Sequence, residues 1–296
     1  MESAARALRR LLDEPGLRSM PCCFDALSAR LVERAGFELT FMSGFAVSAA
    51  RSGLPDTGLL SYGEMLDQGR DICAAVSIPV IGDADTGYGN PVNTKRTIRG
   101  YAQVGFACAM IEDQLAPKRC GHTEGKEVVP REEALARVRA AVDARDEGAE
   151  ILVMARTDAR APLGFDEALW RAQAFADLGA DIVFLEAPQS ASELERAARE
   201  VPAPGMANLV EGGATPVLPP ARLEEMGFKI AAYPLTLLSS AAAAMQEALE
   251  ALRAGDPAPK LLAFDTLREL VGFDAYDRES ARYDDGAPAP RRKSSA

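Results

Sequence analysis

Eight short apolar runs alternate with longer stretches of helical period along this chain, and no other feature limits its fold as strongly. The short runs are apolar or β-branched, whereas Ala, Arg and Glu dominate the longer stretches. This alternation is typical of parallel βαβ units, in which a helix returns the chain to the start of the next strand. The runs predict strands at 19–23, 39–43, 79–83, 107–112, 151–156, 182–186, 205–208 and 229–233.

The helical stretches match the strands in number and predict helices at 26–35, 62–75, 93–104, 131–147, 165–178, 191–200, 220–226 and 235–253. At four junctions, Gly36, Gly105, Gly179 and Gly227 stand where a helix end needs a left-handed residue. Eight strands with eight helices predict an α/β fold of the (β/α)8 TIM-barrel type, and 296 residues suit one such barrel. A doubly wound sheet uses the same units and is the alternative, although no G-x-G-x-x-G follows the first strand.

The chain changes character after the last predicted barrel helix. A Gly- and Pro-containing break at 255–259 precedes two short helical stretches, 260–272 and 276–282, whose apolar residues need burial. We therefore expect a single barrel domain over 1–283, with a helical extension from about residue 255 that packs on a neighbouring subunit. Residues 284–296 are rich in Pro, Ala, Ser and charge, and are expected to be disordered.

Charge and cysteine usage exclude several classes of protein. The net charge is −11, and the only basic cluster is at 291–293, so nucleic-acid binding is not expected. No apolar run approaches the roughly 20 residues of a membrane span. Five cysteines without paired spacing or a secretory leader indicate a reduced, cytoplasmic protein. The arginine-rich segment 1–12 slightly resembles a transit peptide, but its acidic neighbours argue against that interpretation.

Polar side chains stand at the carboxyl ends of six predicted strands, where the active site of such a barrel lies. One such end alone is more often a solvated strand terminus, but six that converge on one mouth favour a functional site. The residues at these ends are Ser43, Gly44, Asp83, Asp85, Glu112, Arg156, Glu186 and Asn208.

The acidic members of this set predict a metal site. Asp83 and Asp85 are two residues apart, so both carboxylates face the same side of an extended segment, with Glu112 on the adjacent strand. Asp56, in a glycine-containing loop, is a further candidate in an outer position. An all-oxygen ligand set selects a hard ion, so we expect Mg²⁺, with Mn²⁺ as a substitute.

A metal together with Arg156 forms a site for an anion with several oxygens. The predicted substrate is therefore a small polyanionic acid, whose carboxylates backbone amides at glycine-rich turns can approach. No P-loop motif occurs, so ATP-dependent chemistry is not indicated.

The single histidine of the chain, His122, lies in the run Lys118-Arg119-Cys120-Gly121-His122. Cations and an imidazole next to a thiol stabilise its thiolate, so Cys120 is a candidate acid, base or nucleophile. The run follows the fourth predicted strand in a long loop, and we interpret this loop as a gate over the barrel mouth.

These motifs resemble the isocitrate lyase/phosphoenolpyruvate mutase superfamily over roughly residues 5 to 285. The resemblance rests on the Lys-Arg-Cys-Gly-His run at 118–122, on Asp-Ala-Asp-Thr-Gly-Tyr-Gly at 83–89 and on Asn-Leu-Val-Glu-Gly-Gly at 208–213, with Tyr-Pro-Leu at 233–235 among the supporting matches. It implies a (β/α)8 barrel, usually tetrameric, with C-terminal helices exchanged between subunits. It also implies Mg²⁺ held by Asp83, Asp85 and Glu112, largely through water.

Within this superfamily, the Cys-Gly-His loop resembles that of the carbon–carbon lyases, in which the cysteine is the catalytic acid. The resemblance implies retro-aldol cleavage of a 2-hydroxy acid: the C2–C3 bond breaks, a 2-oxo acid forms, and Cys120 protonates the other fragment. Arg156 and the metal would stabilise the developing charge. The remaining implied roles are positioning or substrate binding, and they fall to Ser43, Gly44, Lys118, Arg119, Gly121, His122, Glu186, Asn208 and Tyr233.

The resemblance narrows the substrate to one group within the superfamily, and three alternatives stay open. The chain resembles the 2-methylisocitrate lyase and 2,3-dimethylmalate lyase group, which implies release of pyruvate from a 2-hydroxy di- or tricarboxylate. Carboxyphosphonoenolpyruvate phosphonomutase is the main alternative, because its loop is very similar. Oxaloacetate hydrolysis is a further alternative, against which Pro234 counts, since such hydrolases tend to have serine there. A non-catalytic carboxylate-binding barrel is the last.

Overall fold

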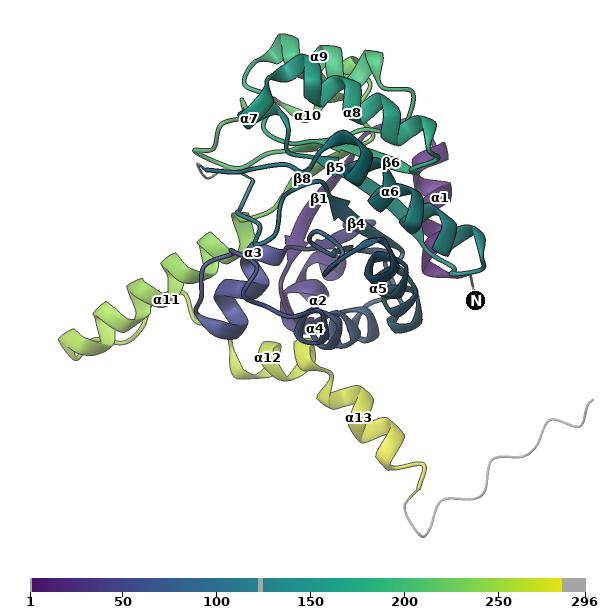
Figure 1. Ribbon diagram of the computed structural model, residues 1–296. Coiled ribbons are helices and arrows are strands. Elements are labelled where there is room, and N and C mark those ends of the chain that lie inside the picture. The colour runs from purple at the N-terminus through teal and green to yellow at the C-terminus, as the bar shows by residue number, and fades with distance from the viewer. Residues whose placement is uncertain (1, 122–124, 284–296) are drawn as a thin grey trace, which may run out of the picture. The chain divides into compact units, whose positions relative to one another are not determined.

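The structure is a computed structural model that describes residues 2–121 and 125–283. The chain divides into two compact units, 1–242 and 243–296. Eight parallel strands form the centre of the first unit (Figure 1). They are β1 (Arg18–Cys23), β2 (Thr40–Met42), β3 (Val80–Asp83), β4 (Cys108–Glu112), β5 (Leu152–Thr157), β6 (Ile182–Leu185), β7 (Met206–Asn208) and β8 (Ile230–Tyr233).

The strand order identifies a barrel. Neighbours follow the order β6-β5-β4-β3-β2-β1-β8-β7, so the first strand pairs with both the second and the last. A parallel bridge between Val183 and Gly205 brings β6 to the segment that enters β7 and nearly closes the ring. The predicted (β/α)8 fold is therefore confirmed. The doubly wound alternative is wrong, because in an open sheet β1 and β8 would not pair with each other.

Helices alternate with the strands as predicted, and the main ones are α2 (Ala26–Arg34), α4 (Tyr62–Ala75), α5 (Pro91–Val104), α6 (Arg131–Asp146), α8 (Phe165–Asp177), α9 (Ala191–Glu200), α10 (Pro220–Met226) and α11 (Thr236–Ala254). Gly36, Gly105, Gly179 and Gly227 have φ values of 87°, 102°, 94° and 108°, so the predicted left-handed helix ends are confirmed. Short helical segments that the sequence did not predict, α3 (Gly44–Val47), the π-helical η1 (Ser48–Ser52) and α7 (Arg160–Leu163), follow β2 and β5.

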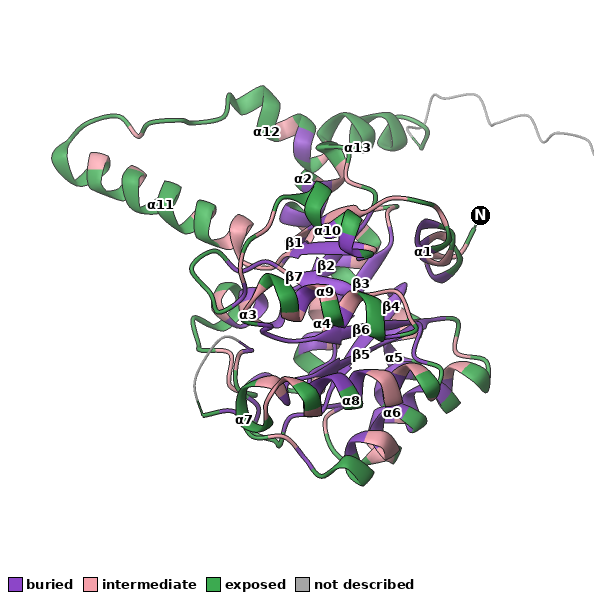
Figure 2. Cartoon of the chain, turned by 90° about the horizontal axis from the view of Figure 1, so that it is seen from above, coloured by how far each residue is buried: buried purple, intermediate pink, exposed green. Residues whose placement is uncertain are grey.

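The strands are buried on both faces, as expected for a barrel enclosed by helices (Figure 2). An N-terminal helix, α1 (Ala4–Asp13), places Leu8, Leu11 and Leu12 in the same core cluster as the barrel residues Met20 and Ile81. Its arginine-rich face forms ion pairs with acidic residues that precede the strands, Glu150 and Asp181. The segment that resembles a transit peptide is thus part of the barrel core.

The second unit contains the last turns of α11, then α12 (Phe264–Val271) and α13 (Phe273–Ser280). No residue of α11 is buried, and this unit exposes large apolar side chains, including Met245, Leu249, Leu252, Phe264 and Tyr276. Within the described residues, no helix is both long enough and apolar enough to cross a bilayer. The tail at 284–296, predicted to be disordered, lies outside the described residues.

Candidate active site

A pocket opens at the carboxyl ends of the barrel strands, where the sequence places its polar residues. Its empty volume is about 520 Å³. Residues from distant parts of the first unit line it: Cys22, Phe41, Ser43, Phe45, Asp56, Asp83, Met110, Cys120, Gly121, Arg156, Phe184, Glu186, Met206, Asn208, Val210, Ala232, Pro234 and Leu235. The barrel therefore brings Asp56 and seven other predicted site residues to one cavity. The seven are Ser43, Asp83, Cys120, Gly121, Arg156, Glu186 and Asn208.

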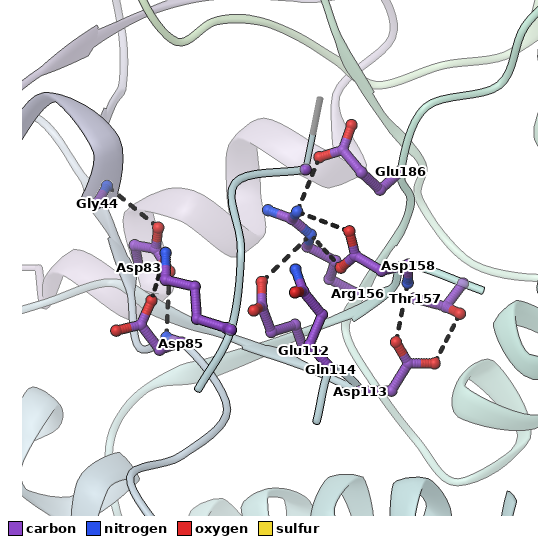
Figure 3. A network of polar contacts seen from close by, with 12 residues as sticks. Gly44, Asp83, Asp85, Glu112, Asp113, Gln114, Arg156, Thr157, Asp158 and Glu186 are labelled. Carbon is purple, nitrogen blue, oxygen red and sulfur yellow. Dashed lines mark hydrogen bonds and ion pairs between the residues drawn. The ribbon is translucent and has the colours of Figure 1, made fainter. Parts of the chain in front are cut away.

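Asp83, the last residue of β3, is held by backbone amides. Its Oδ2 accepts a hydrogen bond from the N–H of Gly44 at 3.1 Å, and its Oδ1 accepts one from the N–H of Asp85 at 3.1 Å (Figure 3). A Cβ on Gly44 would lie 2.4 Å from Oδ2 of Asp83, so only glycine permits this approach. Burial, followed by the neighbouring charge of Asp85, raises the pKa of Asp83 to about 6.

Lys118 supplies a cation to the acidic cluster. Its Nζ lies 2.9 Å from Oδ1 of Asp85 and forms a second ion pair with Asp56, although the three residues are distant in sequence. The Lys118 side chain is only 6% exposed. Burial disfavours its charged form, but Asp85, Asp83 and Asp56 outweigh burial and raise the pKa of Lys118 well above its usual value. The loop that carries Cys120 is thereby joined electrostatically to the loop after η1 and to the segment that follows β3.

The predicted metal ligands lie at the ends of β3 and β4. Among the described residues, no three acidic, cysteine or histidine side chains form a ready metal-binding group. Nevertheless, Glu112 is buried with Oε1 lacking a hydrogen-bond partner, whereas Oδ1 of Asp85 is paired with the Lys118 ammonium. Burial raises the pKa of Glu112 well above its usual range. A buried carboxylate oxygen without a hydrogen-bond partner, next to Asp83 and Asp85, fits a hard divalent cation.

Arg156, near the end of β5, faces three carboxylates. Its Nε and Nη2 donate to Oδ2 and Oδ1 of Asp158 at 2.8 and 2.9 Å, in bidentate geometry. Its Nε also lies 3.4 Å from Oε2 of Glu112, and its Nη2 lies 3.2 Å from Oε2 of Glu186. Figure 3 shows these groups arranged around the guanidinium. The direct pairing of Glu112 with Arg156 between β4 and β5 explains why both side chains enter the same space.

Glu186 and Asn208 form the side of the pocket next to Arg156. Nδ2 of Asn208 lies 3.3 and 3.4 Å from the two carboxylate oxygens of Glu186, and the N–H of Ala187 donates to Oε1 of Glu186 at 2.9 Å. Gly121 lies against this pair: a Cβ there would be 2.5 Å from Oε2 of Glu186 and 2.4 Å from Nη2 of Arg156. The arrangement can hold an anion and places Cys120 beside it.

Some predicted residues are not brought to the pocket. Arg119 is exposed, and its backbone N–H and C=O instead bind the amide side chain of Gln114 at 2.9 and 2.8 Å. Tyr233 packs in the cluster with Leu194 and Leu223, because its neighbour Ala232 faces the barrel interior and a strand alternates its sides. These placements do not support a substrate contact for either residue. The predicted role of His122 lies outside the described residues.

The structure also reveals buried polar residues that the sequence analysis did not assign to the site. Asp113 accepts hydrogen bonds from the Thr157 hydroxyl at 2.7 Å and from the N–H of Asp158 at 2.8 Å, and it pairs with Arg171 at 3.0 Å. Nζ of Lys126 donates to Oδ1 of Asp158 at 3.2 Å. Charged residues directly after β4 and β5 were visible in the sequence, but only the register of these two strands makes them neighbours.

Comparison with known proteins places the chain in a family. The model of the phosphoenolpyruvate phosphomutase family matches residues 8–253, which is most of the chain. The chain belongs to the phosphoenolpyruvate mutase/isocitrate lyase superfamily. Two curated relatives illustrate its range. The 2,3-dimethylmalate lyase of Eubacterium barkeri is 39% identical over 97% of this chain and 100% of its own length. The chloroplastic carboxyvinyl-carboxyphosphonate phosphorylmutase of Arabidopsis thaliana is 40% identical over 93% of this chain and 83% of its own length.

Solved structures of this superfamily share the fold. A crystal structure of 2,3-dimethylmalate lyase superimposes with a TM-score of 0.91 at 38% identity, covering 98% of this chain and 100% of that chain. A phosphonopyruvate hydrolase crystallised with oxalate and Mg²⁺ has a TM-score of 0.84 at 30% identity, covering 95% of this chain and 99% of that chain. The superfamily resemblance drawn from the motifs is thereby confirmed.

Proposed function

We propose that this protein is a Mg²⁺-dependent carbon–carbon lyase that cleaves a 2-hydroxy di- or tricarboxylate of the 2-methylisocitrate or 2,3-dimethylmalate type into pyruvate and a second carboxylate. The observation that carries this proposal is that Cys120 lines the same pocket as Arg156, Glu186 and Asp83. A thiol acid beside an arginine and a carboxylate cluster provides the groups that retro-aldol cleavage requires. The lyase relatives support the same class.

Each residue of the pocket has a separate role in the proposed cleavage. A carboxylate of the acidic cluster accepts the proton of the 2-hydroxyl as the C2–C3 bond breaks, C2 becomes the carbonyl of pyruvate, and the electron pair of the broken bond enters the second fragment as an enolate. The guanidinium of Arg156 stabilises this charge, and Cys120 then donates a proton to the carbon. The Ser43 hydroxyl binds the 2-oxo acid end, beside Gly44, whose N–H holds Asp83, while Glu186 and Asn208 orient Arg156.

A bound divalent ion would be held by Asp83, Asp85 and Glu112, with Asp56 farther out, and would supply positive charge to the substrate oxygens. Asp83 is already oriented by two backbone amides, and Glu112 retains a carboxylate oxygen without a hydrogen bond. Lys118 contributes a further positive charge at Asp56 and Asp85. These residues fit Mg²⁺ better than a softer ion.

The apolar part of the pocket favours a substrate with an alkyl substituent. Phe41, Phe45, Val210, Pro234 and Leu235 are among the lining residues, and an alkyl group loses its contact with water against such side chains. A third carboxylate at the same place would require a charged or hydrogen-bonding partner. A 2-alkylmalate therefore fits better than a tricarboxylate.

The decisive experiment is a substrate panel. Purified protein with Mg²⁺ is incubated with 2-methylmalate, 2,3-dimethylmalate, 2-methylisocitrate and oxaloacetate, and pyruvate is measured by coupled reduction. Turnover of one or more of the first three acids, abolished by EDTA, supports the proposal. No pyruvate from any of these three contradicts it, while oxalate release from oxaloacetate would support the hydrolase instead.

A phosphonomutase is the second candidate, and the Arabidopsis relative favours it. The reaction of carboxyphosphonoenolpyruvate differs from the lyase reaction, since its rearrangement forms a carbon–phosphorus bond. Phosphorus NMR of an incubation with this compound distinguishes the two functions. A new carbon-bonded phosphinate signal with no pyruvate from the acid panel would replace the lyase proposal.

We further propose that the protein is a cytoplasmic homotetramer in which C-terminal helices are exchanged between subunits. The exposed apolar side chains of the second unit, including Leu249 and Leu252, support burial against another copy. Light scattering on the full chain should give four times the monomer mass, and Leu249→Glu with Leu252→Glu should give smaller species. A wild-type monomer would contradict this assembly.

A further inference from the structure

A buried lysine outside the predicted site connects the Cys120–Gly121 segment to the arginine of the pocket. The side chain of Lys126 is only 2% exposed. Its Nζ donates a hydrogen bond to the backbone carbonyl of Gly121 and lies 3.2 Å from Oδ1 of Asp158, whose side chain is fully buried. A buried ammonium is retained only where such partners compensate it.

Asp158 receives Lys126 and Arg156 together. Its Oδ1 accepts from Nη2 of Arg156 at 2.9 Å, as well as from Nζ of Lys126 at 3.2 Å, and its Oδ2 accepts from Nε of Arg156 at 2.8 Å. Its backbone N–H is fixed by Asp113 at 2.8 Å. One buried carboxylate thus joins the ammonium that binds Gly121 to the guanidinium that lines the pocket.

The other end of this connection lies directly against the site. Gly121 approaches Arg156 and Glu186 so closely that a Cβ would lie 2.4 and 2.5 Å from their polar atoms. A peptide buried this close to charged groups needs a partner for its carbonyl, because the carbonyl loses water. The Lys126 ammonium is that partner, and the peptide that it binds follows Cys120 by one residue.

Lys126 also adds a second cation to the charged groups around Arg156. Arg156 lies within 3.4 Å of Glu112, Asp158 and Glu186, so one positive charge faces three buried carboxylates. Lys126 shares Asp158 and supplies the second positive charge. Because Lys126 offsets part of the negative charge of Asp158, a bound anion is attracted to Arg156 more strongly than it would be if Arg156 alone compensated the three carboxylates.

We propose that Lys126 is a positioning residue that holds the Cys120–Gly121 segment against Arg156 and Glu186, and so sets the place of the Cys120 thiol in the pocket. Lys126 acts through Gly121 and Asp158 and touches neither the thiol nor the substrate. Its contribution to turnover rests on the proposed lyase function, whereas its effect on the place of the thiol does not.

The test measures the Cys120 thiol in the full-length protein without substrate. The rate of Cys120 alkylation by iodoacetamide is followed by peptide mass mapping in wild type and in Lys126→Met. Loss of the ammonium should raise the rate about ten-fold, as expected when a segment loses a hydrogen bond to a charged group. Lys126→Arg, which keeps the charge and the donors, should return the rate toward that of the wild type.

Lys229→Met is the matched control. Lys229 also donates from Nζ to a backbone carbonyl, that of Glu14 at 2.7 Å, but it precedes β8 at the opposite end of the barrel. This variant should alkylate Cys120 at the wild-type rate. The buried thiols of Cys23 and Cys108, which do not line the pocket, report the integrity of the fold in every sample, because they react only after unfolding.

The result is decisive in either direction. An increase of about three-fold or more in folded Lys126→Met, absent in Lys229→Met, supports the proposal. A smaller increase, or a decrease, overturns it. If Lys126→Met does not fold, Lys126→Gln replaces it under the same criterion.

Kinetics then separate this role from the proposed function. With a substrate from the panel, Lys126→Met should lower kcat more than it raises KM, because the Cys120 thiol acts after the substrate is bound. If the wild-type protein turned over none of the acids, the lyase proposal would be contradicted. The alkylation rates of Cys120 would still decide the role of Lys126.

Discussion

Gly121 and Arg156 are in such close contact that a Cβ on Gly121 would lie 2.4 Å from Nη2 of Arg156. No real Cβ tolerates this distance, and on its other side Arg156 is held by its bidentate contact with Asp158. The peptide after Cys120 therefore occupies a position that only glycine permits. This contact explains why a glycine must separate the cysteine of the loop from the histidine that follows.

Gly121→Ala should lower kcat/KM by about 100-fold, because the added methyl group displaces the Cys120–Gly121 segment by about 1 Å from its place beside Arg156. Steady-state kinetics with the best substrate of the panel measure this. Gly63→Ala in α4 is the control, since its nearest neighbour would lie 3.9 Å away. Equal activity of the Gly121→Ala variant and wild type would mean that the segment does not occupy this position during turnover.

Cys120→Ala and Cys120→Ser should lower kcat by about 10²–10⁴-fold, the usual contribution of a positioned general acid. Metal binding should be unchanged, because the proposed metal ligands are carboxylates and the Cys120 thiol is not one of them. Kinetics and titration with Mn²⁺ followed by electron paramagnetic resonance check the two parts. Cys73→Ala, at a partly buried thiol on α4, should retain full activity. Unchanged turnover in both Cys120 variants would remove this residue from the mechanism.

Metal removal by EDTA should abolish turnover and lower Tm, and Mg²⁺ should restore both, because the buried carboxylates lose the positive charge of the ion and the binding free energy that it adds to the folded state. Glu112→Gln should weaken Mn²⁺ binding by about ten-fold while the protein stays folded, since a neutral side chain suits this buried position. Asp143→Asn, at an exposed position on α6, is the control. Wild-type Mn²⁺ affinity in Glu112→Gln would exclude Glu112 from the metal site.

The stability of the barrel should depend on pH through Glu167. A hydrogen bond from Arg131, reinforced by Arg171, lowers the pKa of this carboxyl from 4.5 to about 2. Between these values the unfolded chain binds a proton that the folded protein does not, so the free energy of unfolding rises with pH across the window.

Glu167→Gln should remove this term. In urea denaturation, the difference in free energy of unfolding between wild type and variant should grow by about 1–2 kcal/mol from pH 2 to pH 5, a value reduced for solvent screening. Glu225→Gln, which breaks an exposed pair with Arg222, should show no such trend. A difference that does not vary with pH would mean that Glu167 titrates normally.

Much of the fold could be predicted because its signals are local. The alternation of apolar runs with helical stretches specifies eight βα units, and a glycine at a left-handed helix end, as at Gly105, depends only on its neighbours in the chain. The polar strand ends were also readable, because in a parallel barrel every strand ends at the same mouth. Asp83, Arg156 and Glu186 accordingly line one pocket.

The sequence by itself determined the barrel, the residues at its mouth and the superfamily to which the chain belongs. Only the tertiary structure decided that Lys118 lies between Asp56 and Asp85, that Lys126 joins Gly121 to Asp158, and that Tyr233 turns away from the pocket. The physical reason is the range of the interactions. Periodicity and capping act over a few residues, whereas a buried charge takes its partner from whichever segment the fold brings within reach.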